Sequence, residues 1–533
     1  MDAQDTLPRL VYRRALSTPD QIALTSVGQG SVTWREVWEN SRRWAGWLED
    51  NGVVSGDRVV TLVPQSLEAA YVWMGCCLIG AVEASINYEF RGEWLRHAIQ
   101  VSSAKVIVLS TRFLDQLLPV LEGSAIEKIL LYDGAAAEMA LAAKVQVVST
   151  PPAAARMAGG DAEPNVFAHD IGCILYTSGT TGASKAVQLP WALLDATWRV
   201  PTSLVGAEPQ VYYFPYSMHH ASGRGALYCA ALTGGRSVTR EIFSTSSFWD
   251  DIRQHGCTYT GLFGAPARFL IDLPERADDT DNPLKLVCVL PLLPQIDSVK
   301  RRFGVEVYSV YGMTEIGNPF VVRPNEAISA NAGSCGRPVA GVEARLVDAH
   351  DYPVPLGSPG ELVLRSTDPW RFTCGYEGAP EATAKAWRNG WFHTGDIFRV
   401  DAKGNYYYLD RSKDMIRRRG ENISSAELEA AVLTHPCIAE VAALGVASTF
   451  ADEEVLIAVV ARAGQRINPP ELISYLKDIV PRFAVPRYVR VLDALPKTPV
   501  TQRVQKQALR TQAVTPDTWD RLSAGATTVN PQT

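Results

Sequence analysis

Short runs of β-branched residues alternate with helix-like stretches along the first third of the chain. Such runs cover residues 58–63, 105–110, 128–132 and 145–148, and helical patterns such as residues 34–48 separate them. Because parallel strands need a crossover connection, which is usually a helix, this alternation predicts layers of helices and parallel sheets. We therefore expect an α/β fold with a large, multi-sheet N-terminal domain.

The pattern changes near residue 411. Residues 411–420, RSKDMIRRRG, concentrate basic side chains, and a compact α+β pattern follows them. We predict a large N-terminal domain over residues 1–410, a hinge at 411–413 and a small α+β C-terminal domain over residues 414–533. The last stretch, 523–533, is small and polar, and we expect it to be disordered.

The net charge, the cysteine count and the apolar runs of the chain exclude several classes of protein. The net charge of −6 indicates neither a nucleic acid nor an anionic membrane as partner. The nine cysteines form no CxxC pair or His/Cys cluster, which favours reduced thiols over disulfides or a zinc site. The N-terminus lacks a signal-peptide pattern, and the longest apolar run, residues 69–82, is too short to span a bilayer. We predict a cytoplasmic protein without an integral membrane segment, and a buried helix at this apolar run.

A loop rich in hydroxyl side chains follows the apolar run 171–175. Residues 176–187 read YTSGTTGASKAV, and Lys185 adds a positive charge. Between a strand and a helix, such a loop can turn backbone N–H groups and hydroxyls toward a phosphate, although a mobile linker has a similar composition. The spacing of Gly182 and Lys185 excludes a Walker A loop, in which Lys directly follows Gly.

The loop closely resembles the phosphate loop of the AMP-forming adenylate ligases, the superfamily of acyl-CoA synthetases, luciferases and peptide-synthetase adenylation domains. Their usual pattern is YTSGTTGxPKGV, and this chain has Ser184 where Pro is usual and Ala186 where Gly is usual. The resemblance implies that the loop binds the phosphates of ATP. The residues that would do so are Thr177, Ser178, Gly179, Thr180, Thr181, Gly182 and Lys185.

Two further motifs follow in the order that the superfamily has them. Residues 311–315, YGMTE, resemble its adenine and magnesium motif, which implies that Tyr311 lies against adenine, Thr314 bonds the α-phosphate and Glu315 holds Mg²⁺. Residues 394–396, TGD, resemble the motif whose Asp, here Asp396, accepts hydrogen bonds from both ribose hydroxyls. Gly312 and Arg411 complete the implied ATP site. In isolation, a plain turn with a surface Glu and an Asx turn are the alternatives.

Residues 215–223, PYSMHHASG, resemble the acyl-pocket motif of the superfamily. The resemblance implies that His220 lies near the acyl carboxylate and takes part in catalysis, whereas a structural role is the alternative for a lone His. Nearby aromatic residues favour an apolar or aromatic acid of moderate size, with core packing as their alternative role. The expected acyl pocket takes in Tyr213, His219, Ser222, Gly312 and Gly317.

Two segments of the small domain extend the resemblance. Residues 420–429, GENISSAELE, resemble the start of that domain and imply that Gly420 and Arg419 approach CoA. Residues 496–506, PKTPVTQRVQK, stand where the superfamily has PKTxTGKVxK, with Arg503 at the position of the catalytic Lys. Because Arg keeps the charge but not the shape of Lys, we rank Arg503 first as the catalytic cation, Lys506 or Lys497 second and a weakened adenylation last.

The resemblance implies ATP-dependent conversion of a carboxylic acid to acyl-AMP, with pyrophosphate release, followed by thioester formation with CoA. ATP, Mg²⁺ and CoA are the implied cofactors, and the small domain is expected to be mobile about Lys413. Residues 80–95 favour the acyl-CoA ligase branch, including its carnitine/crotonobetaine-like members.

Three alternatives stay open. The first is transfer of the activated acid to an amine or to a carrier protein in trans. The second is a nucleotide-binding homologue weakened in catalysis by Arg503. The third, a P-loop kinase, is disfavoured by the Gly–Lys spacing. The acid and the oligomeric state, a homodimer included, do not follow from the sequence.

Overall fold

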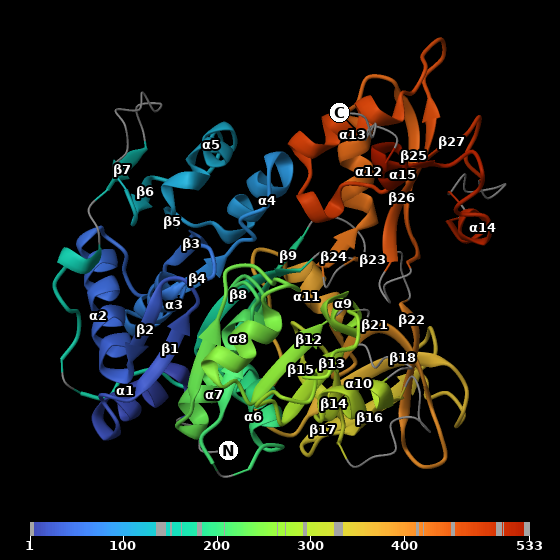
Figure 1. The fold of residues 1–533 in the computed structure, drawn as a ribbon. Coiled ribbons are helices and arrows are strands. Elements are labelled where there is room, and N and C mark those ends of the chain that lie inside the picture. The colour runs from blue at the N-terminus through green and yellow to red at the C-terminus, as the bar shows by residue number, and fades with distance from the viewer. Residues whose placement is uncertain are drawn as a thin grey trace. The chain divides into compact units, whose positions relative to one another are not determined.

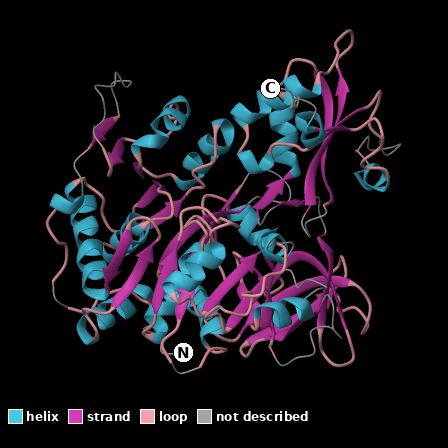
Figure 2. Ribbon diagram, viewed as in Figure 1, coloured by secondary structure: helices cyan, strands magenta, loops and turns pink. Residues whose placement is uncertain are grey.

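The computed structural model describes most of the chain and divides it into two compact units. Unit 1 comprises Met1–Tyr88, Ala98–Thr177 and Lys185–Asp410, and unit 2 comprises Glu89–His97, Ser178–Ser184 and Arg411–Thr533. The described residues are 5–134, 145–149, 152–160, 162–177, 184–206, 208–263, 265–271, 273–290, 296–324, 334–411, 415–418, 421–448, 453–496, 504 and 506–526. The predicted α/β class is confirmed, as the alternating helices and strands in Figures 1 and 2 show.

One sheet of unit 1 follows the predicted alternation. Within the described residues it has eight strands in the order β19-β9-β8-β4-β3-β5-β6-β7, and β8, β4, β3, β5, β6 and β7 are parallel. Each predicted strand is present with its ends shifted by at most two residues. The bounds are β3 (Arg58–Leu62), β4 (Val82–Ser85), β5 (Val106–Leu109), β6 (Lys128–Leu131), β7 (Gln146–Val148), β8 (Ile171–Thr177), β9 (Lys185–Pro190) and β19 (Gly375–Tyr376).

The local sequence explains why two helices form between strands of this part of the chain. At α2 (Trp34–Asp50), the Thr33 hydroxyl accepts the N–H of Glu36 while the Glu36 carboxylate accepts the N–H of Thr33, a capping box that fixes the helix start. In α3 (Leu67–Leu78), most residues are buried on every side, so the buried helix predicted at the longest apolar run is confirmed. The other helices in this part of the sequence are α1 (Leu7–Ser17), α4 (Gly92–Ser102), which is divided between the two units, and the short α5 (Leu114–Leu117).

The second sheet of unit 1 changes character along its width. Its strands from β1 to β14 are largely parallel, whereas β14 to β17 pair antiparallel. The strands are β1 (Ile22–Ser26), β2 (Gly30–Thr33), β10 (Val211–Tyr213), β11 (Arg236–Thr239), β12 (Tyr259–Phe263), β13 (Leu286–Leu290), β14 (Glu306–Met313), β15 (Gly317–Val322), β16 (Ser334–Pro338), β17 (Val342–Val347), β18 (Gly360–Ser366), β20 (Trp387–Arg388), β21 (Trp391–Val400) and β22 (Tyr406–Arg411). The helices are α6 (Trp191–Thr202), α7 (Ala221–Thr233), α8 (Phe248–His255), α9 (Ala265–Ile271), α10 (Ile296–Phe303) and α11 (Pro380–Ala386).

Unit 2 has the predicted α+β pattern. A hairpin of β23 (Met415–Arg418) and β24 (Glu421–Ser424) precedes a sheet in the order β25-β26-β27-β28. The remaining elements are α12 (Ser425–Leu433), β25 (Ile438–Ala447), β26 (Glu453–Ala461), α13 (Pro469–Ile479), β27 (Tyr488–Val491), α14 (Lys506–Thr511), β28 (Trp519–Asp520) and α15 (Arg521–Ala526). The hinge residues Ser412 and Lys413 lie outside the described residues, and the boundary at 411–413 stays a prediction.

The tail differs in part from the expectation of disorder. Helix α15 includes residues 523–526, while residues 527–533 lie outside the described part of the chain. Asp520 accounts for the helix start, because its carboxylate accepts the N–H of Leu522 at 2.9 Å and the hydroxyl of Ser523 at 3.3 Å. A small, polar composition alone did not reveal this cap.

The cysteines agree with the predicted reduced state. All nine are free thiols, and most of them are buried. Among the described helices, none is long and apolar enough to cross a membrane.

Candidate active site

The hydroxyl-rich loop lies in a different setting from the one expected. It connects β8 to the antiparallel strand β9, so that Thr177 pairs with Lys185, and no helix follows it directly. Residues 185–190 form a strand because their backbone pairs with β8 on one side and β19 on the other, and this pairing overrides the strand-to-helix expectation. The central loop residues, Ser178, Gly179, Thr180, Thr181 and Gly182, lie outside the described residues.

Lys185 is connected to Glu315 through a tyrosine that sequence analysis did not single out. The Lys185 ammonium lies 4.3 Å from the centroid of the Tyr376 ring, a cation–π contact. The Tyr376 hydroxyl donates to Glu315 Oε1 at 3.0 Å. Burial, followed by the nearby Glu315 charge, raises the pKa of Tyr376 well above its ordinary range, so the phenol stays protonated and remains a donor.

The sequence did not predict Tyr376 as a site residue, because no motif or strand pattern surrounds it. It belongs to β19, a strand of only two residues that pairs with β9. The preceding Gly375 has φ +133°, a conformation that favours glycine, so the Gly-Tyr pair is a local signal that could have indicated a special backbone position.

Glu315 offers a hard oxygen ligand in a buried place. Its residue is 4 % exposed, and its backbone carbonyl accepts the N–H of Thr373 at 2.7 Å. Magnesium is commonly held by one or two carboxylates together with the phosphate oxygens of a nucleotide. A buried carboxylate next in sequence to the Thr314 hydroxyl fits that donor set.

The two predicted glycines beside this motif have packing reasons. A Cβ on Gly312 would lie 2.1 Å from the carbonyl oxygen of Gly317, so β14 and β15 can approach this closely only with glycine there. Gly317 itself has φ +61°, and a Cβ on it would lie 2.2 Å from Thr197 Oγ1. Both glycines thus shape the turn that presents Thr314 and Glu315.

Tyr311 and Asp396, from two motifs far apart in sequence, meet directly. The Tyr311 hydroxyl donates to Asp396 Oδ2 at 2.7 Å, and both residues are buried. The Asp396 N–H donates to Thr394 Oγ1 at 3.1 Å, which holds the backbone of this strand. The Tyr311 ring also packs edge-on against Phe398, with ring centroids 4.8 Å apart. Arg411 ends β22, and its side chain lies outside what the structure describes.

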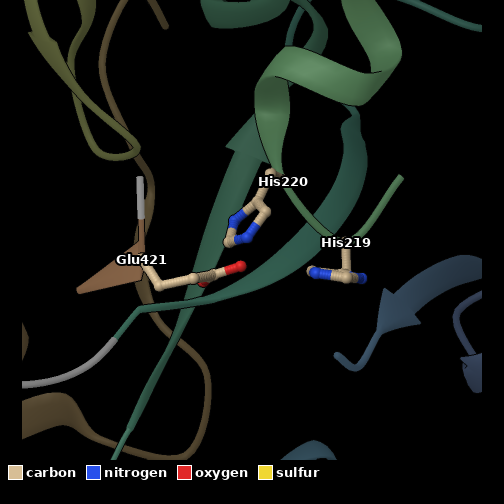
Figure 3. A group of neighbouring side chains, drawn as sticks. All are labelled: His219, His220 and Glu421. Carbon is tan, nitrogen blue, oxygen red and sulfur yellow. The ribbon is translucent and has the colours of Figure 1, made fainter. Parts of the chain in front are cut away.

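His219 and His220 project side by side from the segment that leads into α7, with ring centroids 4.5 Å apart (Figure 3). His219 is buried, and burial, with the charges of His220 and Arg224, lowers its pKa well below the ordinary value, so the ring is neutral. Among the described residues, its Nε2 has no hydrogen-bond partner. The ring stands edge-on to Tyr88, which is hydrogen-bonded to Ser217 at 3.0 Å.

Of the other predicted pocket residues, Ser222 lies in the first turn of α7, but Tyr213 does not join His219. The Tyr213 hydroxyl donates to Asp251 Oδ2 at 2.7 Å, and Asp251 is paired with Arg240. Successive side chains of a strand point to opposite faces, and Tyr213 packs with Phe248 in a core cluster separate from that of its sequence neighbours Tyr212 and Phe214. Its local role is therefore core packing, the alternative that the sequence left open.

Most small-domain candidates lie outside the described residues: Lys413, Arg419, Gly420, Lys497 and Arg503. Lys506 is described, and it is held within unit 2. Its Nζ donates to Ser425 Oγ at 2.8 Å and lies 2.7 Å from Glu429 Oε1. These contacts within its own unit distinguish Lys506 from a lysine that extends into solvent.

Comparisons with known proteins agree with this geometry. A family model described as AMP-binding enzyme matches residues 11–372, and one described as AMP-binding enzyme C-terminal domain matches residues 427–501. The chain is 29 % identical over 496 residues to a crotonobetaine/carnitine–CoA ligase of Escherichia coli O1:K1 / APEC, covering 89 % of this chain and 93 % of that protein.

Solved structures share the fold. A double mutant of o-succinylbenzoate CoA synthetase from Bacillus subtilis has a TM-score of 0.81 at 23 % identity, covering 95 % of this chain and 98 % of that one. The amide bond synthetase McbA from Marinactinospora thermotolerans has a TM-score of 0.82 at 23 % identity, covering 95 % of this chain and 99 % of that one.

Proposed function

The chain belongs to the AMP-binding enzyme family, and from this premise we propose that it is an acyl-CoA synthetase: it activates a carboxylic acid with ATP and transfers the acyl group to CoA. The observation that carries the proposal is the 2.7 Å hydrogen bond from Tyr311 to Asp396, which joins the adenine and ribose motifs. The link from Lys185 through Tyr376 to Glu315 supports a neighbouring triphosphate and magnesium site.

Two displacements make up the reaction. A carboxylate oxygen of the acid attacks the α-phosphorus of ATP, and the bond to pyrophosphate breaks. The sulfur of CoA then attacks the acyl carbon, loses its proton and displaces AMP. The substrates supply both nucleophiles, so the protein contributes position and electrostatic stabilisation.

In the proposal, individual residues position the substrates and stabilise their charges. Asp396 binds the ribose, Tyr311 lies against adenine, and Lys185 offsets phosphate charge, while His220 lies near the acid. Glu315 would hold Mg²⁺, which neutralises phosphate charge when bound. Arg503 supplies the cation for adenylation, and the small domain rotates about Lys413 so that Gly420 and Arg419 serve the CoA step.

The test of the proposal identifies the acyl acceptor and the acid substrate. The relatives named above support CoA, whereas the amide bond synthetase fold leaves an amine as second candidate. Acid-dependent pyrophosphate release should be measured over a panel of carboxylic acids, with and without CoA. Acyl-CoA and AMP as products are the expected result. Release of ADP, or of an amide with added amine and no thioester with CoA, would contradict the proposal.

The free cysteines support a cytoplasmic location, where thiols stay reduced. A net charge of −6 supports small-molecule substrates over nucleic acid as partners.

Replacing Tyr376 with Phe should lower kcat for pyrophosphate release by about tenfold, because a hydrogen bond to a charged group contributes about 1.5–3 kcal/mol. The ring that contacts Lys185 is kept, so only the donor to Glu315 is lost. Initial rates and the melting temperature should be measured together.

Tyr407→Phe is the matched control for that variant. Tyr407 also donates to a carboxylate at 3.0 Å, that of Asp401, but outside the candidate site. It should leave kcat unchanged, and equal losses in the two variants would argue against a role for Tyr376 in the site.

A further inference from the structure

The two histidines lie in a tight turn that runs into the first turn of α7, and we call residues 216–223 the histidine turn. The N–H of His220 donates to the carbonyl of Ser217 at 3.0 Å, and the N–H of Gly223 donates to that of His220 at 3.1 Å. A Cβ on Gly223 would lie 2.1 Å from the carbonyl oxygen of Ser217, so the turn requires glycine there. Both hydrogen bonds lie within the turn. The position of the turn in unit 1 therefore depends on contacts with residues outside it.

Arg224 joins the histidine turn to the core. Its Nε–H donates to the carbonyl oxygen of Met218, the residue before His219, at 2.8 Å. The guanidinium lies 2.7 Å from Glu83 Oε2 and 4.4 Å from the centroid of the Trp73 ring. Arg224 is 0 % exposed and Glu83 is 1 % exposed, so both charges are removed from water.

Glu83 is in turn fixed to the parallel sheet. It lies in β4, and its Oε1 accepts the hydroxyl of Thr61, from the neighbouring strand β3, at 2.7 Å. One chain of contacts therefore runs from two strands of the sheet through a carboxylate and a guanidinium to the backbone of the histidine turn.

Stability alone does not explain a buried ion pair. Taking both charges out of water costs several kcal/mol per ion, and a well-packed apolar pair of similar volume is often as stable or more stable. What an apolar pair cannot supply is the donor to the Met218 carbonyl. The pair is therefore suited to holding a particular backbone segment in place.

We propose that Arg224 and Glu83 are positioning residues for the acid substrate: they hold the histidine turn, and with it His219 and His220, at the acyl site. The inference rests on the proposed function for the role of that site. Neither residue contacts the reacting atoms in this proposal. Loss of the pair should therefore weaken use of the acid while leaving the nucleotide site intact.

The decisive variant is the double replacement Glu83→Leu with Arg224→Met. It removes both charges together, so no buried charge is left unpaired and the protein should remain folded. The acid KM should rise by about tenfold and the ATP KM should change by less than about twofold, a split that reports loss of acid binding alone. A stable double variant with an unchanged acid KM would overturn the inference.

A control variant separates position from stability. Asp279 pairs with Arg302 at 2.6 Å, and Arg302 donates to the carbonyls of Ile271 and Leu273, so this pair also anchors backbone, away from the histidine turn. Asp279→Asn and Glu83→Gln should both lower the melting temperature, but only Glu83→Gln should raise the acid KM. An equal rise in both would assign the effect to stability and overturn the inference.

Hydrogen exchange tests the same inference without catalysis. Amides of residues 216–223 should exchange faster in the double variant than in the wild type, and Asp279→Asn should leave them unchanged. Unchanged exchange in the double variant would overturn the positioning role whatever the activity. Absence of pyrophosphate release from the wild type with every acid would count against the proposed function instead.

Discussion

Arg503→Ala is expected to slow acid-dependent pyrophosphate release by about 10²–10³-fold, the usual cost of removing one group that stabilises transition-state charge. In adenylation, two anions approach each other: the carboxylate of the acid and the α-phosphate of ATP. A cation at the position of the family's catalytic lysine offsets that repulsion. Pyrophosphate release from saturating ATP and acid measures the loss directly.

Lys506→Ala is the comparison that ranks the two cations. Lys506 is engaged by Ser425 and Glu429 within unit 2, so its replacement should affect the stability of that unit and leave most of the adenylation rate. Arg503→Lys keeps the charge and should retain more activity than Arg503→Ala. A large loss in Lys506→Ala with little loss in Arg503→Ala would reverse our ranking.

The second half-reaction provides a further check on Arg503. With acyl-AMP supplied, thioester formation no longer needs the adenylation cation, so Arg503→Ala should form acyl-CoA at nearly the wild-type rate. A parallel loss in both half-reactions would indicate a general defect of the small domain instead.

The parts of the fold that could be predicted are those set by local patterns. Strands β3, β5, β6 and β7 follow short runs rich in β-branched and other apolar residues, and their ends agree with prediction to within two residues, because such side chains fit a buried, pleated sheet. The apolar helix α3 could also be predicted from its sequence, because a helix that is buried on every side is apolar throughout. That the hydroxyl-rich loop leads into a strand and not into a helix could not be predicted, because β9 is defined by its pairing with β8 and β19.

The contacts that complete the candidate site come from residues far apart in the chain. Tyr376 lies in a two-residue strand, and its role depends on Lys185 and Glu315, which are distant in sequence. Glu83 and Arg224 likewise have no common motif, and only the fold brings them together. For Tyr213, the face of the sheet that the side chain occupies depends on the pairing of β10 with its neighbours, which the sequence does not show.

Asp396→Asn should raise the ATP KM and lower kcat/KM for ATP by about 10²-fold, because two hydrogen bonds from ribose hydroxyls to a carboxylate contribute about 1.5–3 kcal/mol each and the amide keeps only part of them. The substitution keeps the size of the side chain and an oxygen that can accept the Tyr311 hydroxyl. The acid KM should change little. ATP titration of the initial rate, with calorimetric ATP binding alongside, measures the effect.

Asp251→Asn is a closely matched control for this last substitution. Asp251 also accepts a tyrosine hydroxyl at 2.7 Å, that of Tyr213, and it is also buried. Because Asp251 pairs with Arg240 as well, its neutralisation should lower the melting temperature more than Asp396→Asn does, yet leave the ATP KM unchanged. If both variants raised the ATP KM alike, the carboxylate of Asp396 would be supporting the fold and not the ribose, and the observation that carries the proposed function would lose its meaning.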